Sequence, residues 1–271
     1  MALILVIGVL LILGIIFYKK STPKPKQQPS AYMTEKDIPS IIETAEEGDI
    51  EAQKFLANTY FNGLALDKDY KKSLYWYTKA AEQGDVEAQF MAGFIQNIEE
   101  NFEEAASWYH KAAEAGHIFA QYYLGFYYNQ GQGVVQDYEQ AFFWYQKSAN
   151  QGCFFAQYSL GLMYYKGEGR EKDDANAFYW FSKAAEQGHA ESQYTTGLMY
   201  KKGKGVERDY IKALFWLNKA AEQNSAEAQF HIGVIYQNGE GVTQNTTIAK
   251  EYFAKACNNG IEEACKNYEK L

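Results

Sequence analysis

The sequence contains few of the residues that build catalytic and metal sites. Its 271 residues include only three cysteines and four histidines. It has no His-x-x-x-His, Cys-x-x-Cys or Gly-x-Ser-x-Gly motif, so the usual signatures of zinc proteases, redox proteins and serine hydrolases are missing. The Gly-x-Gly pairs recur as turns and do not follow strands, which argues against a phosphate-binding loop. We therefore expect no catalytic residues, no cofactor and no metal site.

Proline and acidic residues are each missing from one part of the chain. Three of the four prolines lie between residues 23 and 29, and none follows Pro39. Residues 1–30 contain no Asp or Glu but hold four of the 26 basic residues, which leaves 22 basic and 34 acidic residues and a net charge of −12 in the remainder. Such an acidic domain is poorly suited to the phosphate backbone, so we expect no nucleic-acid partner.

The N-terminal run Met1–Tyr18 has no charged side chain. As a helix it would be about 27 Å long, close to the thickness of the hydrocarbon core of a bilayer. A cleaved signal peptide is the alternative, but the run lacks a preceding basic region and a following small-x-small cleavage site. The sequence thus predicts a transmembrane anchor at residues 1–18 and a Pro-, Lys- and Gln-rich tether at residues 19–33.

Lysines follow the anchor, and no basic side chain precedes it. The positive-inside rule then predicts a single-pass membrane protein whose C-terminal domain lies in the cytoplasm. A periplasmic domain is the alternative, and two cysteines near the C-terminus bear on it.

A phrase close to Trp-Tyr-x-Lys-Ala-Ala-Glu-Gln-Gly recurs along the rest of the chain. All five tryptophans occupy one phase of it, at Trp76, Trp108, Trp144, Trp180 and Trp216, and Tyr252 holds that phase in a sixth copy. The spacing is 36 residues, except for 32 between the first two copies. A period of this size predicts an all-α, α/α superhelical solenoid, in which neighbouring units bury each other's apolar faces. Such folds usually bind partners rather than catalyse reactions.

The period divides the chain into six repeats between two half-units. The repeats are 49–84, 85–116, 117–152, 153–188, 189–224 and 225–260, and the half-units 34–48 and 261–271 are predicted to be capping helices. Each repeat should contain a first helix, a glycine turn and a second helix, such as Ala190–Lys202 and Tyr210–Gln223. The second repeat lacks the glycine turn, so its loop must be tight. In the C-terminal half-unit we expect Tyr268 on the apolar side with Ala264.

Asp or Asn precedes every second helix, at Asp69, Asn101, Asp137, Asp173, Asp209 and Asn245. These residues are typical N-caps, and we prefer that role to a row of metal ligands.

Glycine ends the recurring phrase, with Asn224 once in its place, as expected where a helix ends in a left-handed residue. A further glycine or alanine inside each first helix, such as Gly197, should let a neighbouring helix approach closely. His117 and His189 precede first helices, where we expect caps or surface residues.

The motif of residues 190–223, Ala-x-x-Gln-Tyr-x-x-Gly-x-x-Tyr, then Gly-x-Gly-Val, then Asp-Tyr and Trp-x-x-Lys-Ala-Ala-Glu-Gln, closely resembles the Sel1-like repeat. That family is related to the tetratricopeptide repeat, and the resemblance extends over residues 49–260. It implies an adaptor that makes protein–protein contacts in signalling, envelope processes or host interaction. The family has no shared catalytic residues, so the resemblance implies a protein that is not an enzyme.

In tetratricopeptide-like solenoids the first helices line a concave groove, where a protein or peptide partner would bind. Glu at positions 51, 87, 191 and 227 is replaced by Phe119 and Phe155 in the two middle repeats. The positions four residues later hold Tyr123, Ser159, Thr195 and His231 in the last four repeats. Residues four apart share a helix face, so we expect these six residues to form the candidate groove, with an aromatic patch in mid-solenoid. The alternative is that the rings fill gaps between helices.

The resemblance also implies a possible disulfide. In a cysteine-rich, secreted Sel1-like subgroup, two cysteines eight residues apart bridge successive helices, and Cys257 and Cys265 have this spacing. A bridge would place the domain in an oxidising compartment, as a periplasmic or exported interaction factor, in conflict with the lysines. The alternative is that both cysteines are small buried residues. Some members of the subgroup have been linked to β-lactam binding or hydrolysis, but this sequence offers no nucleophile for it.

Overall fold

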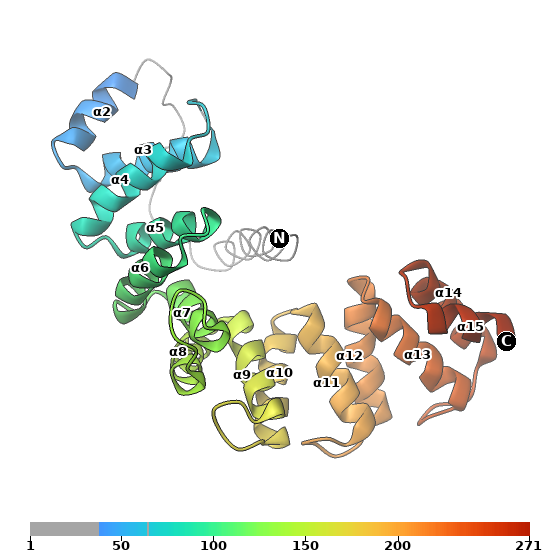
Figure 1. Ribbon diagram of the computed structural model, residues 1–271. Helices are drawn as coiled ribbons and strands as arrows, with labels where there is room; N and C mark the ends of the chain where they lie inside the picture. Colours follow the sequence, from blue (N-terminus) through green and yellow to red (C-terminus); the bar gives the residue numbers. More distant parts are fainter. Residues whose placement is uncertain (1–37, 64) are drawn as a thin grey trace.

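The computed structural model describes residues 38–63 and 65–271, which form a bent stack of helix pairs (Figure 1). Each helix packs chiefly against its neighbours in sequence. The helices are α2 Ile38–Glu46, α3 Ile50–Asn62, α4 Tyr70–Glu82, α5 Val86–Ile98, α6 Phe102–Glu114, α7 Ile118–Gln130, α8 Tyr138–Asn150, α9 Phe154–Lys166, α10 Asp174–Glu186, α11 Ala190–Lys202, α12 Tyr210–Glu222, α13 Ala226–Asn238, α14 Thr246–Asn258 and α15 Glu262–Lys270. The predicted all-α solenoid is confirmed.

The predicted anchor at 1–18 and tether at 19–33 lie outside the described residues. Within the described ranges, no helix combines the length and the apolar composition needed to cross a membrane. The odd-numbered helices from α3 to α13 are the first helices of the repeats, and the even-numbered helices from α4 to α14 are the second. The shorter helices α2 and α15 correspond to the two half-units.

Side-chain caps start five of the six second helices, as the sequence predicts. The Asp173 carboxylate, for example, accepts hydrogen bonds from the backbone N–H groups of Ala175 and Asn176. The prediction is wrong for Asn101, whose side chain caps nothing and instead donates to Gln96 Oε1 at 2.9 Å. The cause is the tight loop of the second repeat, where only three residues join α5 to α6 and Glu100 has a φ of 62°.

The glycine inside five of the six first helices is required by close packing, as predicted, and Ala57 holds the position in α3. A Cβ placed on Gly161 would lie 2.6 Å from the ring of Phe181, far inside van der Waals contact. The same approach recurs between Gly125 and Tyr145 and between Gly233 and Phe253. The ring in each case belongs to the residue that follows the Trp phase, so that residue occupies the centre of the repeat.

The tryptophans themselves are less central than the recurring phrase suggests. Trp76, Trp144 and Trp180 are buried, whereas Trp108 and Trp216 are only half-buried. Complete burial occurs one residue later, at positions such as Tyr109, Phe181, Leu217 and Phe253. The residues at the Trp phase therefore pack against the side of the hydrophobic core, and the residue after each of them fills the core.

A pair of side-chain amides ties the two ends of almost every repeat together. Gln157 Nε2 donates to the carbonyl of Ala149 in the preceding helix, and its Oε1 accepts from Gln187 Nε2 at 2.8 Å. The same amide pair occurs at Gln53/Gln83, Gln121/Gln151, Gln193/Gln223 and Gln229/Asn259. In the second repeat Ala115 replaces the second amide, and Gln89 Oε1 is buried without a hydrogen-bond partner.

At the C-terminal end, α15 covers α14 with only part of its predicted apolar side. Ala264 is fully buried, whereas Tyr268, which faces α14 on the predicted side, is 41% exposed. Lys250 Nζ lies 5.0 Å from the centroid of the Tyr268 ring. The tyrosine ring therefore contacts this cation at the rim of the helix and stays open to solvent.

Candidate partner-binding face

We call the side of the solenoid that carries positions 155, 159, 162 and 166 of α9, and their equivalents in the other first helices, the first-helix face. The structure places the two phenylalanines of this face largely in the packing between repeats. The ring of Phe119 lies 6.3 Å from that of Phe90, and the ring of Phe155 lies 5.7 Å from that of Tyr122, each measured between centroids. Both rings are half-buried against the hydrophobic core, as the alternative interpretation expects, and their part in partner binding stays a prediction.

Tyr123 is withdrawn still further from the surface. It is only 5% exposed and stacks on Tyr109 with ring centroids 4.9 Å apart. Burial raises the pKa of the Tyr123 phenol well above its ordinary value of 10.0, with smaller contributions from Tyr122, Tyr127 and Cys153. A partner cannot reach this ring without displacing the core.

The other three candidate residues are half-buried on the first-helix face. The hydroxyl groups of Ser159 and Thr195 donate to backbone carbonyls one turn earlier, at 2.9 and 2.8 Å. The His231 ring stacks on Tyr194 with centroids 5.9 Å apart. Burial, followed by the charges of the nearby lysines 201 and 202, lowers the pKa of His231 to about 4. These three side chains therefore present neutral polar groups at neutral pH.

A pocket of about 190 Å³ opens on this face between α9 and α11. Its lining consists of Leu162, Tyr165, Phe181, Thr195, Leu198, Met199, Lys202 and Lys204. Of these, only Thr195 was among the residues expected from the sequence. Leu198 and Lys202 follow Thr195 by three and seven residues, and Leu162 follows Phe155 by seven, so helical spacing alone extends the candidate face to them.

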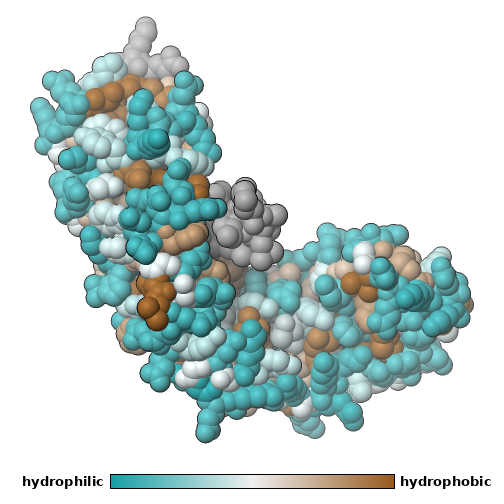
Figure 2. All heavy atoms as spheres, viewed as in Figure 1, coloured by the Kyte–Doolittle hydropathy of each residue, from teal (hydrophilic) through white to brown (hydrophobic). Residues whose placement is uncertain are grey.

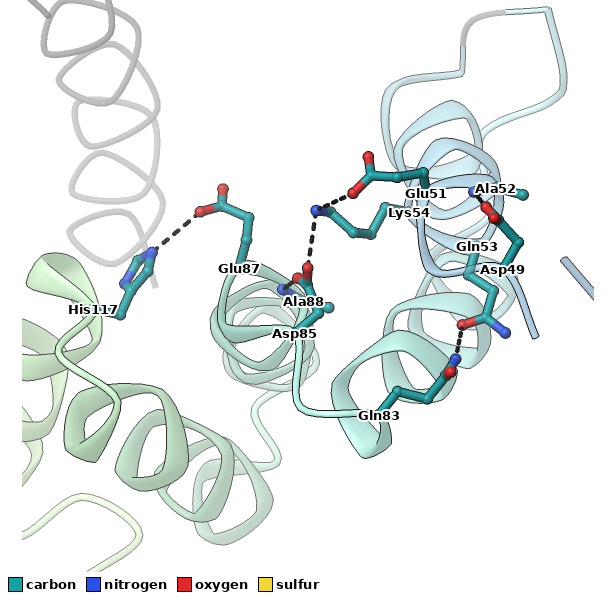
Figure 3. Close-up of polar contacts among 10 residues, drawn as sticks. All are labelled: Asp49, Glu51, Ala52, Gln53, Lys54, Gln83, Asp85, Glu87, Ala88 and His117. Carbon is teal, nitrogen blue, oxygen red and sulfur yellow. Dashed lines mark hydrogen bonds and ion pairs between the residues drawn. The ribbon is translucent and has the colours of Figure 1, made fainter. Parts of the chain in front are cut away.

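Ion pairs and caps join successive first helices at their N-terminal ends (Figure 3). Lys54 Nζ lies between Glu51 Oε1 at 3.2 Å and Asp85 Oδ2 at 3.0 Å, bridging the first two repeats. His117 confirms its predicted role as a cap, because its Nδ1 accepts from the Ala120 backbone N–H. Its Nε2 in turn donates to Glu87 Oε2 of the preceding repeat at 3.3 Å.

His189 departs from the expectation of a cap or surface residue. It makes no capping hydrogen bond to the backbone, and its Nδ1 lies 2.7 Å from Ser192 Oγ. Its ring packs against Phe154 and Tyr158, with centroids 5.4 and 5.0 Å away. Burial lowers the pKa of His189 to about 4 because the imidazolium would lose its hydration there.

The opposite side of the solenoid carries an aromatic row that sequence reasoning missed. Tyr75, Phe143, Tyr179 and Phe215, each just before a tryptophan, are 45–54% exposed. Phe143 stands edge-on to Trp144 at 4.9 Å, and Lys147 Nζ lies 4.5 Å from the Phe143 ring centroid. Lysines four residues later cover the other three rings in the same way. The signal was visible as an aromatic preceding Trp and a Lys one turn later.

Cys257 and Cys265 form a disulfide that joins the end of α14 to α15. Cys153 is a buried free thiol whose pKa is raised by burial. Among the residues that the structure describes, no group of three or more His, Cys, Asp or Glu side chains is placed to hold a metal ion.

Comparison with known proteins identifies the repeat. The Sel1 repeat model matches residues 50–85, 86–117, 118–153, 155–189, 190–225 and 226–261. A crystal structure of a protective antigen present in uropathogenic Escherichia coli strains, with an SLR fold, is 35% identical with a TM-score of 0.79, covering 84% of this chain and 50% of that one. The present chain thus spans about half the length of that antigen.

A Sel1 repeat protein from Oxalobacter formigenes is 29% identical, with a TM-score of 0.58 and coverage of 89% of this chain and 83% of that one. No curated protein sequence matches at a significant level. Six consecutive matches cover most of the chain, and they coincide with the helix pairs and glycine contacts described above. The chain belongs to the Sel1 repeat family.

Proposed function

We propose that this protein is a membrane-tethered scaffold that binds a protein or peptide partner on its first-helix face. The observation that carries the proposal is the unbroken stack of six helix pairs, whose first helices present one continuous face. Residues 1–18 would hold the scaffold in the membrane, residues 19–33 would act as the tether, and the repeats would face the cytoplasm. We propose no catalytic step.

Each repeat uses different positions for packing and for contact with solvent, which supports this proposal. The residues that most repeats share are used for packing, as the contact between Gly161 and Phe181 and the amide pair of Gln157 and Gln187 illustrate. The residues that differ between repeats, such as Ser159 and Thr195, lie half-exposed on the first-helix face. Recognition of a partner therefore falls to the positions that packing leaves free.

The test is partner capture from solubilised native membranes with the variants Ser159→Arg and Thr195→Arg. These positions are better probes than Phe119 and Phe155, whose replacement would disturb the packing between repeats. We expect both variants to lose most of the captured partner while remaining folded, which their melting temperatures check; Ser159→Arg should melt somewhat lower because Ser159 also hydrogen-bonds to the buried Tyr145. Phe215→Arg, on the opposite side, is the matched control and should capture normally. Equal capture by all variants would reject the first-helix face as the binding surface.

A second candidate function is an exported or periplasmic interaction factor, and the Cys257–Cys265 disulfide favours it. Such a bridge persists in an oxidising compartment, whereas the lysines after the anchor favour the cytoplasm. A reporter enzyme fused to the C-terminus, active only on one side of the membrane, separates the two. Thiol counting on native protein supplies the second readout: one reactive thiol after unfolding supports export, and three support the cytoplasm.

A β-lactam hydrolase is the third candidate, and a chromogenic substrate should show no turnover above background.

A further inference from the structure

The pocket between α9 and α11 has an apolar floor formed by side chains of the hydrophobic core. Phe181 and Met199 form its base and are buried, while Leu162 and Leu198 form its walls and remain half-exposed. Its volume of about 190 Å³ is below the range of roughly 300–1,000 Å³ typical of small-molecule sites. A space of this size suits one bulky apolar side chain better than a whole metabolite.

The polar rim of the pocket is positively charged. Lys204 Nζ lies 3.6 Å from the centroid of the Tyr165 ring and 3.5 Å from Asp174 Oδ1, so its charge is already engaged. Lys201 pairs with Glu240 at 3.2 Å. Lys202 is exposed and makes no ion pair within the part of the chain that the structure describes. It is the cation at this rim that remains available to a ligand.

Lys202 belongs to the lining of the pocket and stands in the last turn of α11, the first helix between α9 and α13. Its charge also lowers the pKa of Tyr165 on α9, after the larger effect of Lys204, and that of His231 on α13, after the larger effect of burial. No acidic side chain lines the pocket, although the domain as a whole is acidic.

We propose that this pocket holds one bulky apolar side chain of an acidic peptide, with a neighbouring carboxylate of the peptide paired to Lys202. The proposal rests on the scaffold function above and specifies the chemistry of the partner. An apolar anchor in a desolvated pocket, next to a charged contact at its rim, is the usual composition of a peptide-binding hot spot. The rest of the acidic domain would repel such a peptide, so binding would be confined to this part of the face.

The experiment is fluorescence polarisation with the full-length protein and the labelled peptide Ser-Gly-Glu-Asp-Phe-Asp-Glu-Gly-Ser. Two comparison peptides replace the Phe by Ser, or the four acidic residues by their amides. We expect the first peptide to bind, both comparison peptides to bind at least about tenfold more weakly, and the affinity to fall as salt is raised. These two changes separate the apolar contact from the charged one.

Two protein variants locate the site. Lys202→Glu reverses the charge of an exposed residue and should weaken binding by about tenfold or more, whereas Lys219→Glu, on the outer side of α12, should leave it unchanged. Thr195→Trp fills the mouth of the pocket and should abolish binding, and its folding is checked by its melting temperature. Lys202→Glu and Lys219→Glu change the net charge of the protein equally, so a difference between them reports on the pocket. Thr195→Trp leaves the net charge unchanged.

The proposal is overturned if the acidic Phe peptide does not bind at about 1 mM. It is equally overturned if Lys202→Glu and Thr195→Trp bind the peptide like the wild type. Capture of the native partner that persists alongside either result would reject this pocket but leave the scaffold function standing. If Ser159→Arg loses partner capture but still binds the peptide, the native partner contacts the first-helix face at Ser159 as well as at the pocket.

Discussion

The amide pair in each repeat shows how one residue determines whether a buried polar group is satisfied. In the first, third, fourth, fifth and sixth repeats an amide at the end of the second helix donates to the glutamine of the first helix. In the second repeat the donor position is Ala115, and Gln89 Oε1 remains buried without a partner. A buried acceptor without a donor costs roughly 1–3 kcal/mol, so this repeat contains a defect that a single substitution should repair.

Ala115→Gln is predicted to raise the free energy of unfolding by about 1 kcal/mol, because its amide would donate to Gln89 Oε1. Chemical denaturation followed by circular dichroism measures the change. Ser107→Gln, exposed on the same helix, is the control and should lie within about 0.5 kcal/mol of the wild type. Gln151→Ala should create the corresponding defect in the third repeat and lower stability. An Ala115→Gln protein no more stable than the control would show that the acceptor is satisfied in another way.

His189 makes stability depend on pH. Its pKa in the folded protein is about 4, below the ordinary value of 6.5 that applies when the chain is unfolded. Between these values the unfolded chain binds a proton that the folded protein does not, so stability is lost as the pH falls below about 6.5. From pH 7 to pH 5 the loss due to His189 should be on the order of 2 kcal/mol.

Urea unfolding at the two pH values measures this loss, and His189→Gln should reduce it. The same substitution at His110, which is more exposed, serves as the control and should leave most of the pH dependence in place. Equal pH dependence in wild type and His189→Gln would show that the imidazole is protonated in the folded state.

At the scale of the helix, the sequence predicted regular elements well and irregular ones poorly. The helix expected at Ala190–Lys202 has these bounds in the structure, because its N-terminal position, its apolar spacing and the glycine after it agree. Asn101 failed as a cap because the four-residue deletion changes the backbone before α6. Such a change is determined by loop geometry rather than by the type of residue at the cap.

The candidate face was predicted only in part for a related reason. Helical spacing placed Phe119 and Phe155 on the correct side of their helices, but how deeply a ring sinks depends on the neighbouring repeat. Phe119, for instance, packs against Phe90 of the repeat before it. The pocket was missed because its walls come from α9 and α11 together, and no single helix shows it.

The Cys257–Cys265 disulfide should stabilise one element and little else. It closes a short loop, for which the chain-entropy model gives roughly 2–3 kcal/mol. Because α15 packs against α14 at the end of the stack, reduction should speed amide exchange in α15 and leave α3–α9 unchanged. Hydrogen-exchange mass spectrometry of oxidised and reduced protein tests this, with the Cys257→Ser, Cys265→Ser double variant as a control that should resemble the reduced form. Identical exchange in α15 under both conditions would contradict it.

At the scale of the whole molecule, the solenoid separates stability from recognition. Each helix packs chiefly against its neighbours along the chain. The stack is bent, so the two sides of the molecule differ (Figure 1). Hydrophobic residues appear on the visible surface as separate patches among hydrophilic ones, rather than as one broad apolar area (Figure 2). A partner is therefore expected to use a few anchors along the stack, such as the pocket between α9 and α11.

Site-specific photo-crosslinking in native membranes tests whether the first-helix face is the binding surface. A photoreactive residue is placed at Ser159 or Thr195 on this face, and at Phe143, Tyr179 or Phe215 on the opposite side. We expect a discrete crosslinked product from the first two positions and none from the other three. Products from the opposite side alone, or from none of the five positions, would contradict it.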